Sequence, residues 1–450
     1  MKTAPRLLAT SAAVLLSGCA SGFDECNLLP PPGSAGQNAP AVILGNIAEF
    51  VVQPNLRSSC EAPSPSQAPD SVSVEVFDPN NHVIAAEASL ANGGHSATVR
   101  FVPKTPGRHH VRVAFAPVGS VQQFGAYVAA EWRGGDATLL ELPRCTQLDR
   151  TTHGTWICDG VALHAKGGNE TRLAGPSGPP DVAVAGNVVW TVGENRVRRF
   201  IDTGAELVLT GTLLLNQRDT VTIVQSRLAT EEELWVLDTE HLHRFAFTSQ
   251  GVVTGATPTP WGLPNRVLFG VDLVQGVLVR TGPTEVQVVQ MALAPDSLAC
   301  AFQVGPAGSF VASEAPCQRL PGVPAGTEDS ALWTRVDNDA SPQPGRTLYR
   351  WAAEHGALVE RGTLMVDAPI ELVSAPLRPG AALPILQWRH SQAGIIVPTV
   401  PATPGALGLE ALPANVDLPY GVRTATPRFY WEAGTGRSTR VYARGESSLK

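Results

Sequence analysis

Hydrophobic and polar residues alternate by twos in short runs along the first third of the chain. Residues 97–102 and 109–115 are two such runs, and both lie close to glycine or proline. Successive side chains of a strand point to opposite faces of a sheet, so each run buries one face. Residues 41–143 hold about seven runs of this kind, which is the size and rhythm of an immunoglobulin-like β-sandwich.

The turn Lys104-Thr105-Pro106-Gly107 separates these two runs and is expected to join them into a hairpin. The stretch resembles filamin- or fibronectin-type repeats, in which a segment of the form Val-x-Phe-x-Pro-x-x-x-Gly-x-His-x-Val-x-Val recurs. The matching residues here are Val99, Phe101, Pro103, Gly107, His109, Val111 and Val113. The resemblance implies an immunoglobulin-like fold for this region.

Beyond Cys145 the chain repeats itself. Trp190 is followed nine residues later by Arg199, and Trp235 nine residues later by Arg244, so both positions recur after 45 residues. A third copy has Trp333 and Arg350, 17 residues apart because a polar insert lies between them. Weaker copies lie at residues 277–280 and 387–389. A period near 45 in a chain of short strands is typical of four-stranded propeller blades.

At that period residues 144–450 hold six or seven blades, so the predicted fold is all-β, a sandwich followed by a β-propeller. The turn Asp202-Thr203-Gly204 resembles one found in quinoprotein-like propellers. We expect the last hairpin, residues 428–431 and 439–442, to pair with residues 155–163 and close the ring. Closure of that kind leaves no exposed sheet edge.

The N-terminus predicts an export signal. Residues 1–18 contain Lys2 and Arg6, then a short apolar stretch, and end before Cys19. Leu16-Ser17-Gly18-Cys19 resembles the lipobox of bacterial lipoproteins, which implies a lipid on Cys19 and cleavage before it. The residues directly after Cys19 are Ala20 and Ser21, with no Asp to resemble the inner-membrane retention signal, which favours the outer membrane, on its periplasmic side or at the surface. Residues 19–40 are rich in glycine, proline and serine and predict a flexible tether.

Six further cysteines are an even number, as expected in an oxidising compartment. Spacing favours pairing of neighbours, although other pairings remain open. Zinc ligation is the rival interpretation, but no Cys-x-x-Cys occurs. The predicted disulfides are Cys26–Cys60, Cys145–Cys158 and Cys300–Cys317.

The net charge is −7, and no segment concentrates Lys or Arg, which excludes nucleic acid as a partner. The sequence has no Gly-x-Ser-x-Gly, no phosphate-binding glycine loop and no His-Glu-x-x-His. These observations assign no catalytic residue, no cofactor and no metal, although residues converging from several blades would leave no such motif.

Two histidines form the sharpest candidate for metal chemistry. His241 and His243 lie on one face of a predicted strand and have the spacing of metal ligands. Phe245 and Phe247 continue that face, so we expect the histidines to pack between blades.

Three other polar groups are weaker candidates. His109 and His110 point to opposite faces of their strand. Asp337-Asn338-Asp339 lacks the glycine and the closing Glu of a calcium loop. Glu231-Glu232-Glu233 is expected to be a solvated turn.

The repeated Trp and Arg residues have two interpretations. Arg199, Arg244 and Arg350 would bind a ligand if they lined the central channel. The preferred interpretation is that each repeat fills an equivalent wedge between blades, since equivalent packing sites select the same residue.

We therefore expect an outer-membrane-anchored lipoprotein that acts as a non-enzymatic binding or scaffold protein for protein or glycan partners. One alternative is a propeller enzyme, a hydrolase, lyase or quinone-dependent dehydrogenase, with its site at the central channel. The other is a surface adhesin that binds through the sandwich. The folds alone do not decide between these functions.

Overall fold

The alternating runs become strands in the structure, a computed structural model of the chain, and helix is limited to one short turn among the residues described. Those residues are 42–54, 69–94, 96–117, 120–132, 134, 138–141, 145, 147–164, 170–173, 180–193, 195–216, 220–221, 223–261, 276–291, 296–328, 330–337, 345–367, 370–372, 383–388, 396–399, 405–412, 422–426, 428–433 and 439–443. None of them belongs to a helix with the length and apolar character needed to cross a bilayer.

Two sheets form the N-terminal sandwich. One has the order β1-β8-β7-β3-β4 and the other β2-β6-β5. Their bounds are β1 (Val42–Ile43), β2 (Ala48–Val52), β3 (Ser71–Phe77), β4 (Val83–Ile84), β5 (Ala86–Ala91), β6 (Ser96–Phe101), β7 (Gly107–Ala116) and β8 (Ser120–Ala129).

The buried face of each strand faces the other sheet. Alternate residues of β7, Val111, Val113 and Phe115, are buried against Val99 and Phe101 of β6 and their neighbours. Burying such side chains contributes roughly 1.5–3 kcal/mol each.

The expected hairpin at residues 104–107 is wrong, because β6 and β7 lie in opposite sheets and do not pair. Pro103 and Pro106 lack the N–H that a ladder needs, and Gly107 has a φ of 131°. The turn therefore carries the chain from one sheet to the other and stacks two apolar faces.

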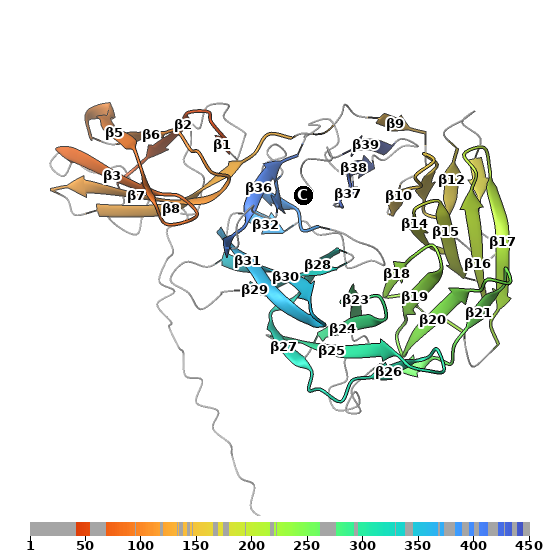
Figure 1. Cartoon of the computed structure of the whole chain (residues 1–450). Helices are drawn as coiled ribbons and strands as arrows, with labels where there is room; N and C mark the ends of the chain where they lie inside the picture. The colour runs from red at the N-terminus through yellow and green to blue at the C-terminus, as the bar shows by residue number, and fades with distance from the viewer. Residues whose placement is uncertain are drawn as a thin grey trace, which may run out of the picture.

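Seven further sheets are arranged around a common centre as a β-propeller (Figure 1). The first four are built from β10 (Leu148–Arg150), β11 (Trp156–Cys158), β12 (Val161–Leu163) and β13 (Glu170–Arg172); β14 (Asp181–Ala185), β15 (Val188–Gly193), β16 (Arg196–Asp202) and β17 (Leu207–Leu214); β18 (Ser226–Ala229), β19 (Glu233–Leu237), β20 (His241–Phe247), β21 (Val253–Gly255) and β22 (Thr259–Pro260); and β23 (Gly276–Arg280), β24 (Glu285–Met291), β25 (Asp296–Val304), β26 (Phe310–Ala312) and β27 (Gln318–Pro321).

The other three blades complete the ring. They contain β28 (Val323–Glu328), β29 (Ala331–Asp337), β30 (Gly345–Glu354), β31 (Ala357–Asp367) and β35 (Gly405–Ala406); β32 (Ile370–Leu372), β33 (Leu386–Trp388), β34 (Ile396–Thr399) and β36 (Gly408–Ala411); and β37 (Val422–Ala425), β38 (Phe429–Ala433), β39 (Thr439–Ala443) and β9 (Thr138–Leu140). In each blade the first strand lies nearest the axis (Figure 1).

The ring closes through β9, not through residues 155–163 as expected. Strand β39 pairs antiparallel with β9, from Thr439 opposite Leu140 to Val441 opposite Thr138. Residues 155–163 belong to β11 and β12 of the first blade, where both of their edges are already paired. Strand β9 therefore supplies the outer strand of the last blade before the chain enters the first, and it lies on the N-terminal side of residue 143.

The sandwich packs against the outer strands of the fifth and sixth blades (Figure 1). Tyr127 of β8 is buried in one core with Trp333 and Leu409 of the propeller. Its hydroxyl donates to the Met365 carbonyl at 3.2 Å and accepts from the Asp367 N–H at 2.9 Å. Burial and the nearby Asp367 carboxylate raise the pKa of Tyr127. The sandwich and the propeller therefore share a hydrophobic core.

Candidate functional site at the propeller axis

Three blades contribute polar residues at one end of the axis, where their inner strands begin. Arg227 is the second residue of β18, Asp181 opens β14, and Gln147 immediately precedes β10. Arg227 Nη1 donates to Asp181 Oδ1 at 3.2 Å, and Nη2 donates to Gln147 Oε1 at 2.6 Å. We call these three residues the axis cluster.

Burial controls the electrostatics of the axis cluster. The Arg227 side chain is only 6% exposed, and burial lowers its pKa despite the nearby carboxylates of Asp181, Asp149 and Asp159. Burial also raises the pKa of Asp181, and Arg227 only partly offsets this. An arginine stays charged in proteins even so, and the cluster is therefore an ion pair between a buried guanidinium and a half-buried carboxylate, with an amide oxygen as third member.

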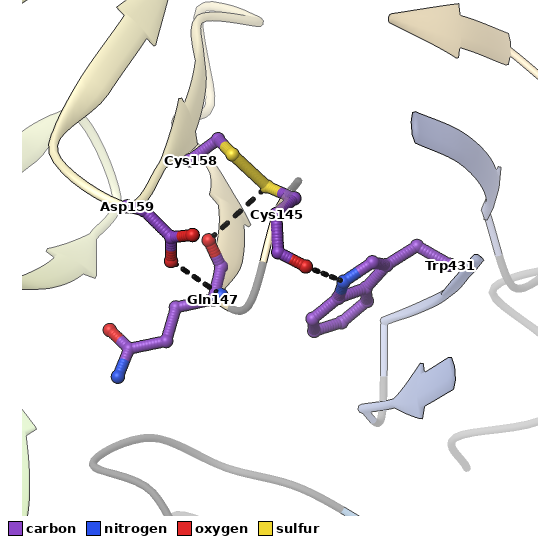
Figure 2. Close-up of a disulfide and its surroundings, with 5 residues drawn as sticks. All are labelled: Cys145, Gln147, Cys158, Asp159 and Trp431. Atoms are coloured by element: carbon purple, nitrogen blue, oxygen red, sulfur yellow. Dashed lines mark hydrogen bonds between the residues drawn. A yellow bond between two sulfur atoms is a disulfide. The ribbon is translucent and has the colours of Figure 1, made fainter. Parts of the chain in front are cut away.

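A disulfide holds one member of the axis cluster in place (Figure 2). Cys145 and Cys158 are bonded, and between them the Gln147 N–H donates to Asp159 Oδ1 at 2.8 Å. On the other side, Trp431 Nε1 of β38 donates to the Cys145 carbonyl at 3.3 Å. The disulfide thus ties the segment before β10 to β11 of the first blade, the Trp431 hydrogen bond joins that segment to the last blade, and the Gln147 side chain connects it to the third blade.

The second disulfide, Cys300–Cys317, lies within the fourth blade. It ties β25 to the segment just before β27, which pairs with the same strand. Both bonds join neighbouring cysteines, as the spacing predicted. Cys19, Cys26 and Cys60 lie outside the described residues.

The repeated Arg residues do not line the axis, because they lie on the third strand of their blades. Each is directly opposite its repeated Trp, as in the pairs Trp190–Arg199, Trp235–Arg244 and Trp333–Arg350.

The contacts of these Trp and Arg residues are structural. Arg244 pairs with Glu233, and Arg350 donates to both oxygens of Glu328 at 3.1 Å. All three Trp rings are at most 1% exposed. The packing interpretation of the repeat accounts for these contacts.

Glu233 corrects a further expectation. It is half-buried and accepts from Trp235 Nε1 at 2.8 Å as well as from Arg244, whereas Glu231 and Glu232 are exposed. The third glutamate of that run is therefore a structural partner, not part of a solvated turn.

The remaining candidates are placed as follows. His109 is buried and His110 half-buried on opposite sides of β7. Asp337 pairs with Arg346 at 2.9 Å and Arg335 at 3.3 Å, while residues 338 and 339 lie outside the described residues.

His241 and His243 lie on the same side of β20, as predicted, and the structure adds Asp238 to them. His243 Nε2 is 3.0 Å from Asp238 Oδ2, and the two imidazole centroids are 6.0 Å apart.

Sequence reasoning missed the axis cluster. Arg227, Asp181 and Gln147 belong to no repeated motif, and they are separated by 46 and 80 residues along the chain. The usable signal was the blade period, which would have placed Asp181 and Arg227 at equivalent starts of inner strands.

Comparison with protein-family models and with curated proteins gives no match. Among solved structures, a periplasmic gluconolactonase of Pseudomonas aeruginosa is 13% identical over 70% of this chain and 94% of its own, with a TM-score of 0.37. A structural-genomics protein from Bacteroides thetaiotaomicron is 13% identical over 89% of this chain and 95% of its own, at 0.32. The N-terminal domain of Nup159 is 10% identical over 70% and 97%, at 0.25. The all-β propeller fold rests on the seven sheets themselves.

Proposed function

We propose that the chain is an outer-membrane-anchored envelope lipoprotein that acts as a non-enzymatic binding or scaffold protein for protein or glycan partners. The lipobox at Cys19 supports the anchor, since two or more acyl chains give stable membrane attachment. The proposal includes the immunoglobulin-like assignment of the sandwich and the tether at residues 19–40.

One observation carries the non-enzymatic part. The guanidinium at the propeller axis is taken up by the chain itself, because Arg227 is bonded to Asp181 and Gln147 and is almost fully buried. A group held in this way fastens three blades together. We therefore place partner binding on the outer faces of the propeller, by which we mean its exposed surface away from the axis cluster, including the loops at its two ends.

Photo-crosslinking in cells tests where partners bind. A crosslinking amino acid is placed at Arg196, exposed at the start of β16 at the axis-cluster end, at Gln250 in a turn at the opposite end, or at Val83, 71% exposed on the sandwich. We expect one specific adduct from a propeller position. Adducts from Val83 alone would establish the adhesin instead, and no adduct from any position would refute the binding role.

The anchor has a separate test. Mass spectrometry of the mature protein is expected to find a lipid on Cys19, and Cys19→Ala is expected to be unprocessed and free of that lipid. A Cys19→Ala protein processed like the wild type would contradict the lipoprotein assignment, whatever the outcome of the crosslinking.

A propeller enzyme is the second candidate, and its active site would lie at the same axis cluster. Asp149 and Asp159 lie near enough to Arg227 to affect its pKa, so acidic and basic groups converge at the axis. An enzyme would lose turnover of an ester, lactone or glycoside probe in Arg227→Met with its fold intact. The scaffold proposal expects no turnover that depends on Arg227.

A further inference from the structure

A second polar cluster lies two strands outward from the axis cluster in the third blade. Arg227 of β18 is opposite Val236 of β19, and Val236 is opposite His243 of β20, so the three share one cross-strand row. Asp238 follows β19 in the turn to β20. Neither the packing repeat nor the axis cluster accounts for Asp238, His241 and His243 together.

The turn fixes the carboxylate of Asp238. Oδ1 accepts from the backbone N–H groups of Glu240 at 2.8 Å and His241 at 2.6 Å. That arrangement directs Oδ2 toward His243 Nε2, 3.0 Å away. One oxygen therefore holds the hairpin turn, while the other faces His243.

The strand presents both imidazoles on the same side as this oxygen. His243 is buried and its ring stacks on Phe245, with centroids 6.0 Å apart and planes at 12°. His241 is half-buried at the start of β20. One ligand atom from each of Asp238, His241 and His243 lies within 4.8 Å of the other two.

These separations are close to those of a metal site. A tetrahedral ion with bonds of about 2.0–2.2 Å to nitrogen and oxygen places its ligands roughly 3.3 Å apart. The Asp238–His243 separation of 3.0 Å needs only a small expansion. The 4.8 Å limit means that His241 moves by roughly 1.5 Å at most to complete the set.

The surroundings are those of an oriented ligand set. Ligating carboxylates and imidazoles are normally held by outer contacts. Here two backbone N–H groups hold the carboxylate, Phe245 fixes the plane of His243, and Trp261 Nε1 donates to the Asp238 carbonyl at 2.9 Å.

We propose that Asp238, His241 and His243 bind a divalent transition-metal ion, with Zn²⁺ as the expected occupant. Two imidazoles and one carboxylate suit Zn²⁺, and three protein ligands leave a fourth position for water or a partner's side chain. A purely structural Asp–His pair would explain Asp238 and His243 but would not use His241. His241 is therefore the residue that decides.

The test uses the mature full-length protein, stripped with a chelator and titrated with ZnSO₄ by calorimetry, with bound zinc counted by mass spectrometry. His241→Ala removes a half-buried ligand. Asp238→Asn removes the charge but keeps an oxygen for the turn N–H groups. The matched control is His82→Ala, which breaks another Asp–His pair whose imidazole is 78% exposed.

We expect one Zn²⁺ per chain in the wild type and in His82→Ala, and at least tenfold weaker binding in His241→Ala and Asp238→Asn. Circular dichroism checks that each variant is folded, and His241→Ala decides alone if Asp238→Asn is not. Absence of binding by the wild type at micromolar Zn²⁺, or equal binding by wild type and His241→Ala, would overturn the proposal.

Discussion

Two partly buried Arg–Asp pairs, one at the propeller axis and one where the sandwich meets the propeller, differ in whether burial or the neighbouring groups dominate the pKa of the arginine. At the axis, burial outweighs the carboxylates and lowers the pKa of Arg227. At the junction, burial opposes the charge of Arg108, but Tyr127 and Asp367 outweigh it and raise its pKa. Arg108 Nη2 donates to Asp367 Oδ1 at 3.0 Å.

The two pairs also differ in the hydrogen bonds that surround them. Removing charges from water is costly, and the attraction repays it only where extra hydrogen bonds complete the site. The junction has the Tyr127 hydroxyl and a short backbone bridge, in which Ala130 N–H donates to Leu409 O and Ala411 N–H to Ala130 O, but Arg108 Nε is buried there with no hydrogen-bond partner among the described residues. The axis pair depends on Gln147, and so on the disulfide that positions it.

Removing the disulfide of the axis is expected to have the largest effect. Cys145→Ala with Cys158→Ala should lower the free energy of unfolding by about 4 kcal/mol, of which about 3 is loop entropy and the rest the loss of Gln147 as a partner. The control pair Cys300→Ala with Cys317→Ala closes a loop of similar length, 17 against 13 residues, and should cost about 3 kcal/mol. Urea unfolding measures both free energies. Equal losses in the two double variants would show that the Cys145–Cys158 disulfide does not support the axis cluster.

Breaking the axis pair from its two sides is expected to be asymmetric. Asp181→Ala leaves Arg227 buried without its carboxylate and should cost about 3 kcal/mol. Arg227→Met leaves only Asp181, whose side chain is 33% exposed and hydratable, and should cost about 1 kcal/mol. Thermal unfolding compares the two, and a larger loss in Arg227→Met would contradict the account of a desolvated Arg.

Removing one oxygen atom at the junction is expected to lower the free energy of unfolding by less than Asp181→Ala does. Tyr127→Phe removes the hydroxyl between Met365 and Asp367 and leaves the Asp367 N–H without this acceptor, at a cost of about 2 kcal/mol. Tyr442→Phe, a half-buried tyrosine packed against the same core, serves as the comparison. Hydrogen exchange at Asp367 should rise in Tyr127→Phe, and unchanged protection would show that the hydroxyl contributes little.

The smallest expected effect is on pH dependence. The pKa of Asp181 is raised in the folded protein, so its ionisation costs stability as pH rises from the ordinary value of 3.8 through the raised one. Asp202 is the opposite case. Burial alone would raise its pKa, but hydrogen bonds from Thr151 and Gly204 lower it, so its stabilisation is lost as pH falls below 3.8.

Unfolding measured from pH 3 to 7 should therefore show a shallower fall in acid for Asp202→Asn and a steeper one for Asp181→Asn, each relative to wild type. Parallel curves for the two variants would contradict these directions.

Local patterns predicted most of what is local in this fold. Alternation located the strands, the 45-residue period located equivalent Trp and Arg residues, and spacing predicted the pairing of Cys145 with Cys158. Each of these features depends on neighbours along the chain or on repetition of one packing site.

Contacts between segments far apart in the chain could not be predicted from the sequence. The partner of Arg108 is 259 residues away and that of Trp431 is 286 residues away. Closure by β9 and the crossing between β6 and β7 depend on which sheet edge is free after the others have paired. Alternation cannot specify that choice, because it predicts which face a strand buries and not its neighbour.

The central claim is that the axis cluster fastens the ring and that binding occurs on outer faces. The most direct test repeats the crosslinking in cells from Arg196 or Gln250, whichever gives the adduct, in a chain that also carries Arg227→Met. The account predicts the same adduct in similar yield. Loss of that adduct from a protein that is folded and present in normal amounts would contradict the claim and place the function at the axis.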